Sequence, residues 1–233
     1  MIKSIILRLL LNKRVAPRAL RLVMKAHNAL YDLSGSLAIV ANGGKHPKHR
    51  LLRYQEWFRD RMESDWVVID VGSNTGSMAA LLAGKARHVY GIEIVPGLVD
   101  IARRSHAVDN LEFLTGDATT FVYSGCRPID CVTLSNVLEH IHDRVDFIVM
   151  LRQRLPWRDP DRCRFLIRVP TIERDWLAPY KKEFGVEYRL DRTHEIEHTQ
   201  SQFFNEVHAA GLAVEHFEVR FGEFYAVCRG RST

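Results

Sequence analysis

Five short apolar segments rich in β-branched residues follow one another between residues 66 and 170, and they constrain the fold more than any other feature. Segments of helical periodicity lie between them, at residues 77–86, 96–106 and 144–155. Strands that are apolar throughout are buried on both faces, which is typical of a parallel sheet covered by helices on each side. The expected strands are residues 66–72, 88–94, 111–117, 129–135 and 164–170.

Two further apolar runs, residues 213–219 and 224–229, are separated by a short turn that contains Gly222. This spacing predicts an antiparallel hairpin at the C-terminus. The sequence therefore predicts an α/β fold with a doubly wound, mostly parallel seven-stranded sheet of the Rossmann-like type.

The N-terminal segment differs from the rest in charge. Residues 1–55 contain 11 Lys/Arg and one acid, a balance of +10, whereas the whole chain has a net charge of +5. We expect a basic helical arm over residues 1–55 and the main domain over 56–233. Residues 2–9 place Ile2, Ile5, Ile6 and Leu9 on one helical face, which fits peripheral contact with a membrane surface or packing against the domain. Helical periodicity also covers residues from Pro17 onward and residues 51–62.

The four cysteines form no C-x-x-C pair and no regular framework. This usage is typical of a reduced cytoplasmic protein with ordinary thiols. The oligomeric state is left open by the sequence.

Polar and glycine residues mark the ends of the first three strands. The first ends in "VIDVGSNTG", where Asp70, Gly72 and Gly76 form D-x-G-x-x-x-G at a strand-to-helix turn. Glycines there allow close approach of a ligand and positive φ. Glu93 ends the second strand, where an acid can bind ribose hydroxyls, and Asp117 follows the third, within reach of a nucleobase.

In combination these motifs resemble those of class I S-adenosylmethionine-dependent methyltransferases, over roughly residues 49–229. "VYGIEIVPGLVDIAR" is similar to their acidic second motif, "LEFLTGDA" to the third and "VTLSNVLEHI" to the segment after the fourth strand. The resemblance implies S-adenosyl-L-methionine as cofactor. Asn74 departs from the family, which usually has Gly there. The implied cofactor residues are Asp70, Gly72, Ser73, Asn74, Gly76, Glu93, Ile94, Asp117, Ala118, Ser135 and Asn136.

Two other segments resemble bacterial methyltransferases linked to surface polysaccharides. They are "HPKHRLLRY" and "RDWLAPYKKEFGVEYRLDRTHEIEHT". The first implies that Arg53 and Tyr54 close over the cofactor. The loop over residues 171–198, an insertion that we expect to face the acceptor, is longer than a simple crossover needs, and long loops at the carboxyl end of a sheet are commonly functional. It contains Arg174 and other polar residues suited to a polar or anionic acceptor, and we expect Tyr180, Arg189, Arg192 and His198 to bind the acceptor.

The pattern "HEIEH", His194 to His198, matches the H-E-x-x-H signature of zinc hydrolases. Both histidines bind one zinc only when the segment is helical. Thr199 and Gln202 match a capping box, which places the start of the next helix after the pattern. We therefore expect "HEIEH" to lie in a loop and expect no metal site.

Methyl transfer to an alcohol benefits from a base that removes the hydroxyl proton. His140, His194 and Glu195 are the candidate catalytic residues, because imidazole titrates near neutrality. The chain lacks the D/N-P-P-Y/F stretch of methyltransferases that act on base amino groups, so N-methylation of adenine or cytosine in nucleic acid is disfavoured. The basic arm leaves other RNA substrates open, although it has little aromatic interleaving, and a nucleic-acid partner is not expected.

The expected function is O-methylation of a sugar or another small polar acceptor, which can be phosphorylated or lipid-linked. Three alternatives remain: a membrane-associated lipid or quinone-precursor methyltransferase, a non-catalytic cofactor-binding module that partners another protein, and the zinc hydrolase.

Overall fold

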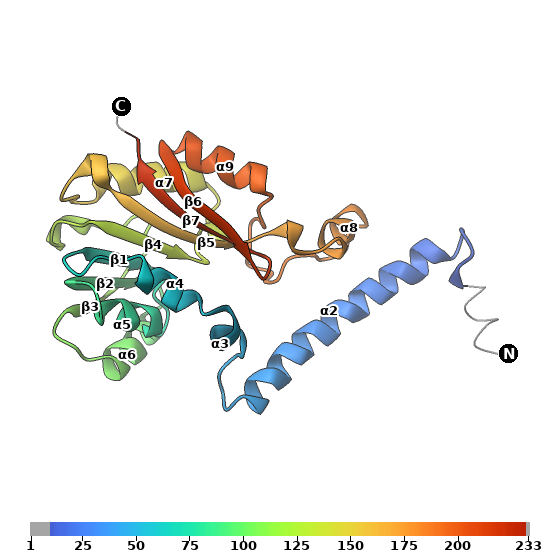
Figure 1. Cartoon of the computed structure of the whole chain (residues 1–233). Helices are drawn as coiled ribbons and strands as arrows, with labels where there is room; N and C mark the ends of the chain where they lie inside the picture. The colour runs from blue at the N-terminus through green and yellow to red at the C-terminus, as the bar shows by residue number, and fades with distance from the viewer. Residues whose placement is uncertain (1–9, 232–233) are drawn as a thin grey trace.

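A seven-stranded mixed sheet forms the centre of the protein, seen in a computed structural model that describes residues 10–231 (Figure 1). The strand order is β3-β2-β1-β4-β5-β7-β6, with the first five strands parallel and β7 antiparallel to both neighbours. This arrangement confirms the predicted fold class and the hairpin. The strands are β1 (Val67–Val71), β2 (His88–Glu93), β3 (Leu111–Thr115), β4 (Cys131–Ser135), β5 (Arg164–Pro170), β6 (Leu212–Arg220) and β7 (Glu223–Gly230).

Helices cover both faces of this sheet. On one face, α4 (Tyr54–Asp60), α5 (Ser77–Ala83) and α6 (Pro96–Ser105) surround a core that includes Val68. On the other, α7 (Arg144–Arg154) and α9 (Gln200–Ala209) pack on a core that includes Ile69. Successive β1 residues thus enter opposite cores, as strand geometry requires. Short 3₁₀ turns lie at Tyr123–Gly125, Leu138–His140 and Pro160–Arg162.

The order of the strands reverses beside β1. The chain runs from β1 to β2 and β3 on one side, then returns to place β4 on the other side of β1. The loops that follow β1 and β4 therefore diverge and leave a crevice at the carboxyl ends of the strands. This topology fixes where the strand-end motifs meet.

The N-terminal arm contains one long helix, α2 (Ala16–Ala41), which extends away from the sheet and passes α8 (Leu177–Glu183) (Figure 1). Met24 is the buried residue of this helix. The helix expected around residues 2–9 lies outside the described residues. None of the helices within residues 10–231 is long and apolar enough to cross a bilayer.

Two expected elements differ in the structure. The helix expected over residues 51–62 is divided into α3 (Lys48–Leu52) and α4, because Arg53 adopts a left-handed conformation with φ of 49°. The segment 171–198, expected as a loop, contains a 3₁₀ turn (Ile172–Arg174) and α8. The Asp175 carboxylate accepts hydrogen bonds from the amides of Leu177 and Ala178 at the start of α8, which favours a helix there. All four cysteines are free thiols, three of them buried.

Candidate active site

A cavity of about 680 Å³ opens at the carboxyl ends of β1, β2 and β3. The structure brings six of the predicted site residues together in its wall, although they come from four different loops. Its lining includes Gly72, Glu93, Ile94, Asp117, Ala118 and His140.

The glycine turn after β1 forms the floor of this cavity. Gly72 and Gly76 have φ values of +70° and +82°, and Asn74 has a positive φ of 51°. A Cβ atom on Gly76 would lie 2.5 Å from the Phe113 ring. The Oγ of Ser73 is buried without a hydrogen-bond partner within residues 10–231. The turn therefore brings its backbone at Gly72 to the cavity wall, whereas the Ser73 hydroxyl is buried behind it.

Glu93 and Asp117 are both held in place by the backbone. The Glu93 carboxylate accepts hydrogen bonds from the amides of Asn74 and Val95, each at 3.0 Å. The Asp117 carboxylate accepts from the amide and hydroxyl of Thr119, at 2.9 and 2.7 Å. Carboxylates at these two strand ends suit a nucleoside, because each has lone pairs left for hydroxyl or amino donors.

Asp70 lies beneath the turn instead of in the cavity wall. It is fully buried and accepts a hydrogen bond from the Thr133 hydroxyl at 2.7 Å. Burial raises the pKa of Asp70 to about 7. Its position indicates that it acts on the ligand through the conformation of the turn.

A buried guanidinium joins β5 to the predicted lid residues. Arg168 Nε donates to the Asn136 side-chain oxygen at 2.8 Å, and the Arg168 guanidinium lies 3.8 Å from the centre of the Tyr54 ring. Ser135 precedes Asn136 at the end of β4. Arg53, in contrast, is largely exposed and pairs with Glu56. Sequence reasoning missed Arg168, although a charge inside the apolar run "RFLIRVP" was a signal.

The loop that contains "HEIEH" docks beside the segment after β4. The rings of His140 and His194 lie 4.9 Å apart, centre to centre. One donor atom each from Glu139, His140 and His194 lies within 4.8 Å of the other two. Partial burial, with the neighbouring His194 adding to it, lowers the pKa of His140 below its usual value. Two of the three predicted catalytic residues therefore form one cluster at the cavity edge.

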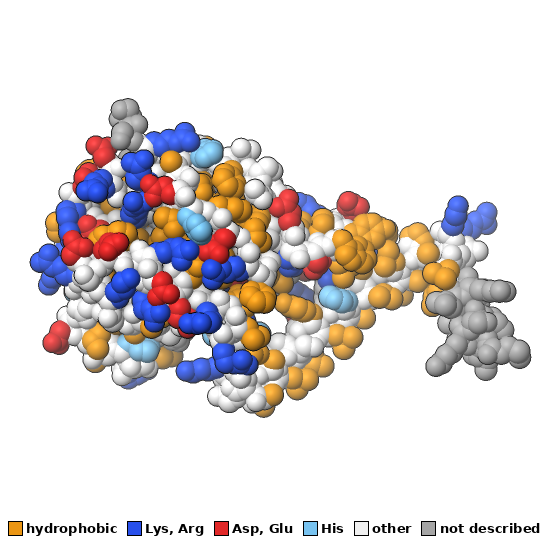
Figure 2. All heavy atoms as spheres, in the orientation of Figure 1, with side chains coloured by type: hydrophobic (Ala, Val, Ile, Leu, Met, Phe, Trp, Pro, Cys, Tyr) orange, Lys and Arg blue, Asp and Glu red, His pale blue; other side chains and the backbone are white. Residues whose placement is uncertain are grey.

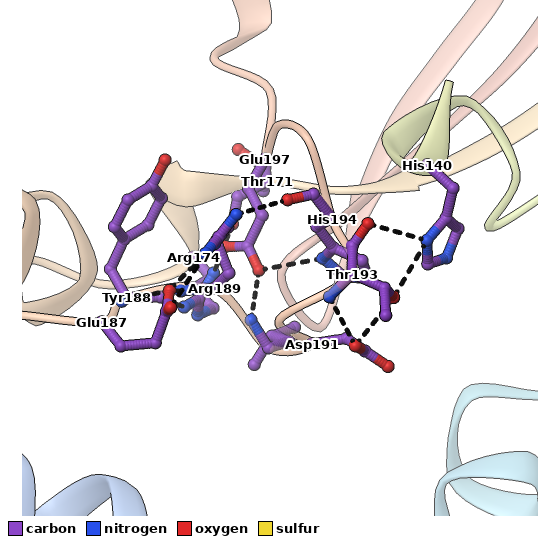
Figure 3. Close-up of polar contacts among 11 residues, drawn as sticks. His140, Thr171, Arg174, Glu187, Tyr188, Arg189, Asp191, Thr193, His194 and Glu197 are labelled. Carbon is purple, nitrogen blue, oxygen red and sulfur yellow. Dashed lines mark hydrogen bonds and ion pairs between the residues drawn. The ribbon is translucent and has the colours of Figure 1, made fainter. Parts of the chain in front are cut away.

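Buried polar contacts hold the His194 side chain in place (Figure 3). Its Nδ1 lies 3.4 Å from Oε1 of Glu197, which is itself bonded to Arg174 and to the Leu190 amide. Glu197 was not predicted from the sequence, and Arg174 was expected to face an acceptor and not to pair with Glu197. They come from the two ends of the insertion and meet only in the fold.

The "HEIEH" segment is not helical, which confirms the loop and the capping box at Thr199 and Gln202. The two histidines of the pattern face different surroundings. His198 is fully buried, and its Nε2 lies 3.0 Å from the Glu206 carboxylate. His198 therefore anchors the loop to α9 and is not near the cavity wall.

The remaining predicted residues do not reach the main cavity. Arg189 and Arg192 line a separate cavity of about 200 Å³ between α2 and the insertion. Arg189 also donates to the His194 carbonyl oxygen at 2.7 Å. Tyr180 packs against Phe184, with ring centres 4.8 Å apart, and Glu195 is exposed, 3.9 Å from His142.

Comparison with known proteins identifies the family. A family model described as "Methyltransferase domain" matches residues 40–216. The chain belongs to this methyltransferase family.

A relative identified by sequence similarity matches part of this methyltransferase. An uncharacterized RNA methyltransferase of Bacillus cereus is 28% identical over 108 residues, which are 43% of this chain and 24% of the relative. The chain thus spans about a quarter of that relative's length.

Two solved structures share the fold. The DhpI–SAH complex has a TM-score of 0.62 at 19% identity, covering 90% of this chain and 98% of that one. Magnesium protoporphyrin IX methyltransferase of Synechocystis PCC 6803, with bound SAH, has a TM-score of 0.59 at 20% identity, covering 79% and 83%.

The lining of the cavity fits S-adenosylmethionine, the cofactor that the sequence motifs imply. The left-handed glycines provide close backbone approach, Glu93 offers a ribose site and Asp117 an adenine site. When bound, the cofactor supplies an electrophilic methyl group.

Proposed function

We propose that this methyltransferase acts in the cytoplasm and transfers the methyl group to a hydroxyl oxygen of a sugar or another small polar acceptor. The paired imidazoles of His140 and His194 at the edge of the cavity carry the proposal. A hydroxyl must lose its proton as its oxygen is methylated, and a neutral imidazole can accept that proton. Burial and the neighbouring His194 lower the pKa of His140, which favours the neutral form of this ring.

The other residues of the cluster have positioning roles in this proposal. Glu197 and Arg174 orient His194, and the Thr193 carbonyl lies 3.3 Å from Nδ1 of His140. The exposed Glu195 lies at the entrance. The acceptor site thus lies between the segment after β4 and the insertion, where an acceptor oxygen meets both rings.

The names of several relatives raise RNA as a second acceptor class, and the charge of +10 on residues 1–55 would favour an anionic acceptor of either kind. To distinguish the two acceptor classes, the protein is incubated with radiolabelled S-adenosylmethionine and, in separate reactions, with nucleotide sugars, polyprenyl-phosphate-linked oligosaccharides or RNA. We expect label in a saccharide, as a methyl ether that survives alkali. Label in RNA alone, an alkali-labile ester, or an N-methyl product would refute the proposal.

A further inference from the structure

The side chain of Glu139 is fully buried, and neither carboxylate oxygen has a hydrogen-bond partner within residues 10–231. The buried Arg168 guanidinium bonds to Asn136 and pairs with Glu223 instead. A carboxylate removed from water without a donor or a cation is strongly destabilised. The Glu139 carboxylate thus lacks a hydrogen-bond partner among the described side chains, and either a proton or a bound cation would stabilise it.

Each of the two histidines beside Glu139 has its Nδ1 near a protein oxygen. Nδ1 of His140 lies 3.3 Å from the Thr193 carbonyl oxygen, and Nδ1 of His194 lies 3.4 Å from Glu197 (Figure 3). A proton on each Nδ1 leaves the Nε2 lone pair free. Metal-binding histidines are commonly fixed in this way, by a carbonyl or carboxylate on the far nitrogen.

We propose that Glu139, His140 and His194 bind a divalent first-row transition-metal cation at the edge of the cofactor cavity. Two imidazoles and one carboxylate favour Zn²⁺, Fe²⁺ or Co²⁺ over Mg²⁺ or Ca²⁺. No metal site was expected from the sequence, in which only the spacing within "HEIEH" suggested one. The proposed ligands come from two distant segments and exclude His198.

Three protein ligands leave coordination positions open to a ligand in the cavity. A hydroxyl bound to such a cation loses its proton at lower pH, since the positive charge stabilises the alkoxide. This role in turnover rests on the proposed function, whereas binding of the cation does not. With the cation bound, the histidines would promote loss of the hydroxyl proton through the cation, whereas without it they would accept that proton directly, as in the proposed function.

The test uses chelator-treated full-length protein. It is titrated with Co²⁺ while visible absorption is recorded, and separately with Zn²⁺ in a calorimeter. We expect one ion per chain at micromolar or tighter affinity. Glu139→Gln and His194→Ala should weaken binding at least tenfold, and Glu195→Gln, a neighbouring exposed carboxylate, should not. Circular dichroism and S-adenosylhomocysteine binding show whether each variant is folded.

No ion bound by the intact protein, or equal binding by Glu139→Gln, would overturn the metal site. Binding that depends on His198 and Glu195 instead of Glu139 would do the same and restore the zinc-hydrolase alternative. If Co²⁺ binds as expected and no methyl ether is formed, only the proposed acceptor class fails.

Seven large apolar residues of α2 are each more than half exposed. Five of them, exposed at 69%, 62%, 52%, 60% and 78% in chain order, are spaced so that they lie on one side of the helix (Figure 2). We call this set the outer stripe. It consists of Leu22, Leu30, Leu33, Leu37 and Val40.

The opposite side of α2 holds the helix to the domain. Met24 is buried there, the Asn28 amide donates to the Glu187 carbonyl at 2.7 Å, and Arg21 donates to the Phe184 carbonyl at 3.0 Å. Lys181 adds a hydrogen bond to the Asn28 oxygen. The outer stripe therefore faces away from the domain.

Exposed basic residues lie along one edge of the N-terminal part of the stripe, and the exposed acid Asp32 lies farther along the same edge. Arg18 and Lys25 are four and three positions from Leu22, and Arg14 precedes them by one turn. Two copies of this positively charged helix would repel each other, whereas an anionic surface attracts it. We propose that the outer stripe and its basic edge bind the surface of an anionic phospholipid bilayer.

Flotation of the full-length protein with vesicles of phosphatidylcholine, with and without phosphatidylglycerol, tests this surface. We expect binding that requires phosphatidylglycerol and falls with salt. Leu30→Ser combined with Leu33→Ser should reduce the bound fraction severalfold, and Val122→Ser, an exposed apolar control outside α2, should not. No flotation, or a stable dimer in light scattering that the same serine pair dissociates, would overturn the proposal.

Discussion

The backbone amide of Glu195 donates a hydrogen bond to the carbonyl oxygen of Glu139 over 2.7 Å. This contact joins the insertion after β5 to the turn after β4. It places His194 beside His140 and fixes the inner edge of the cofactor cavity. The cofactor end of the cavity and its acceptor end therefore depend on different segments, and substitutions can separate them.

Glu93→Ala is expected to weaken S-adenosylhomocysteine binding at least tenfold. The substitution removes the carboxylate assigned to the ribose and also frees the Asn74 amide that it holds. His194→Ala should change this affinity less than threefold while slowing turnover at least tenfold, because His194 lies at the acceptor end. Calorimetry and initial rates measure the two effects. Equal losses of cofactor affinity would contradict the division of roles.

Gly76→Ala should destabilise the protein and lower its melting temperature by several degrees. The residue has a φ of +82°, and the new Cβ would lie 2.5 Å from the Phe113 ring. The left-handed conformation and the overpacking each cost about 1–2 kcal/mol. Gly97→Ala is the matched control, because nothing lies within 4 Å of its Cβ and its φ is not positive. A similar melting temperature for both variants would show that the turn relaxes freely.

The sequence predicted the parts of the site that depend on local patterns. Gly72, Glu93 and Asp117 follow strands, and parallel strands bring their carboxyl ends to one edge. The buried ion pair behind His194 was not predicted from the sequence. Arg174 and Glu197 lie at opposite ends of the insertion, and only its folded path brings them together.

The same limit applies to Glu139. Its burial results from the docking of residues 193–196 over the turn after β4, and no local periodicity encodes that docking. The helix break at Arg53 was also missed, because a left-handed arginine has no signature comparable to that of glycine.

Asp70→Asn should stabilise the protein above pH 7 and leave its stability unchanged below about pH 4. Burial raises the folded-state pKa of Asp70 to about 7, above its unfolded value, so its contribution is favourable at low pH and is lost as pH rises toward 7. Asparagine keeps an oxygen for the Thr133 hydroxyl and carries no charge. Melting curves of both proteins at pH 4 and pH 8 test this, and a variant less stable at pH 8 would contradict it.

Glu206→Gln should show the opposite pH dependence. Burial alone would raise the pKa of this carboxyl, but hydrogen bonds from His198 and Arg144 lower it to about 2. A carboxyl whose pKa is lower in the folded state stabilises the protein at pH values above its unfolded-state pKa. This stabilisation is lost as the pH falls toward 2.

The variant should therefore lose about 1–2 kcal/mol of unfolding free energy at pH 7, a figure reduced because Glu206 is partly exposed. Urea unfolding at pH 7 and pH 3 should show a smaller loss at the lower pH. Glu183→Gln, an exposed carboxylate on α8, serves as the control and should change stability by less than about 0.5 kcal/mol. A pH-independent loss would mean that Glu206 stabilises the loop through its shape and not through its charge.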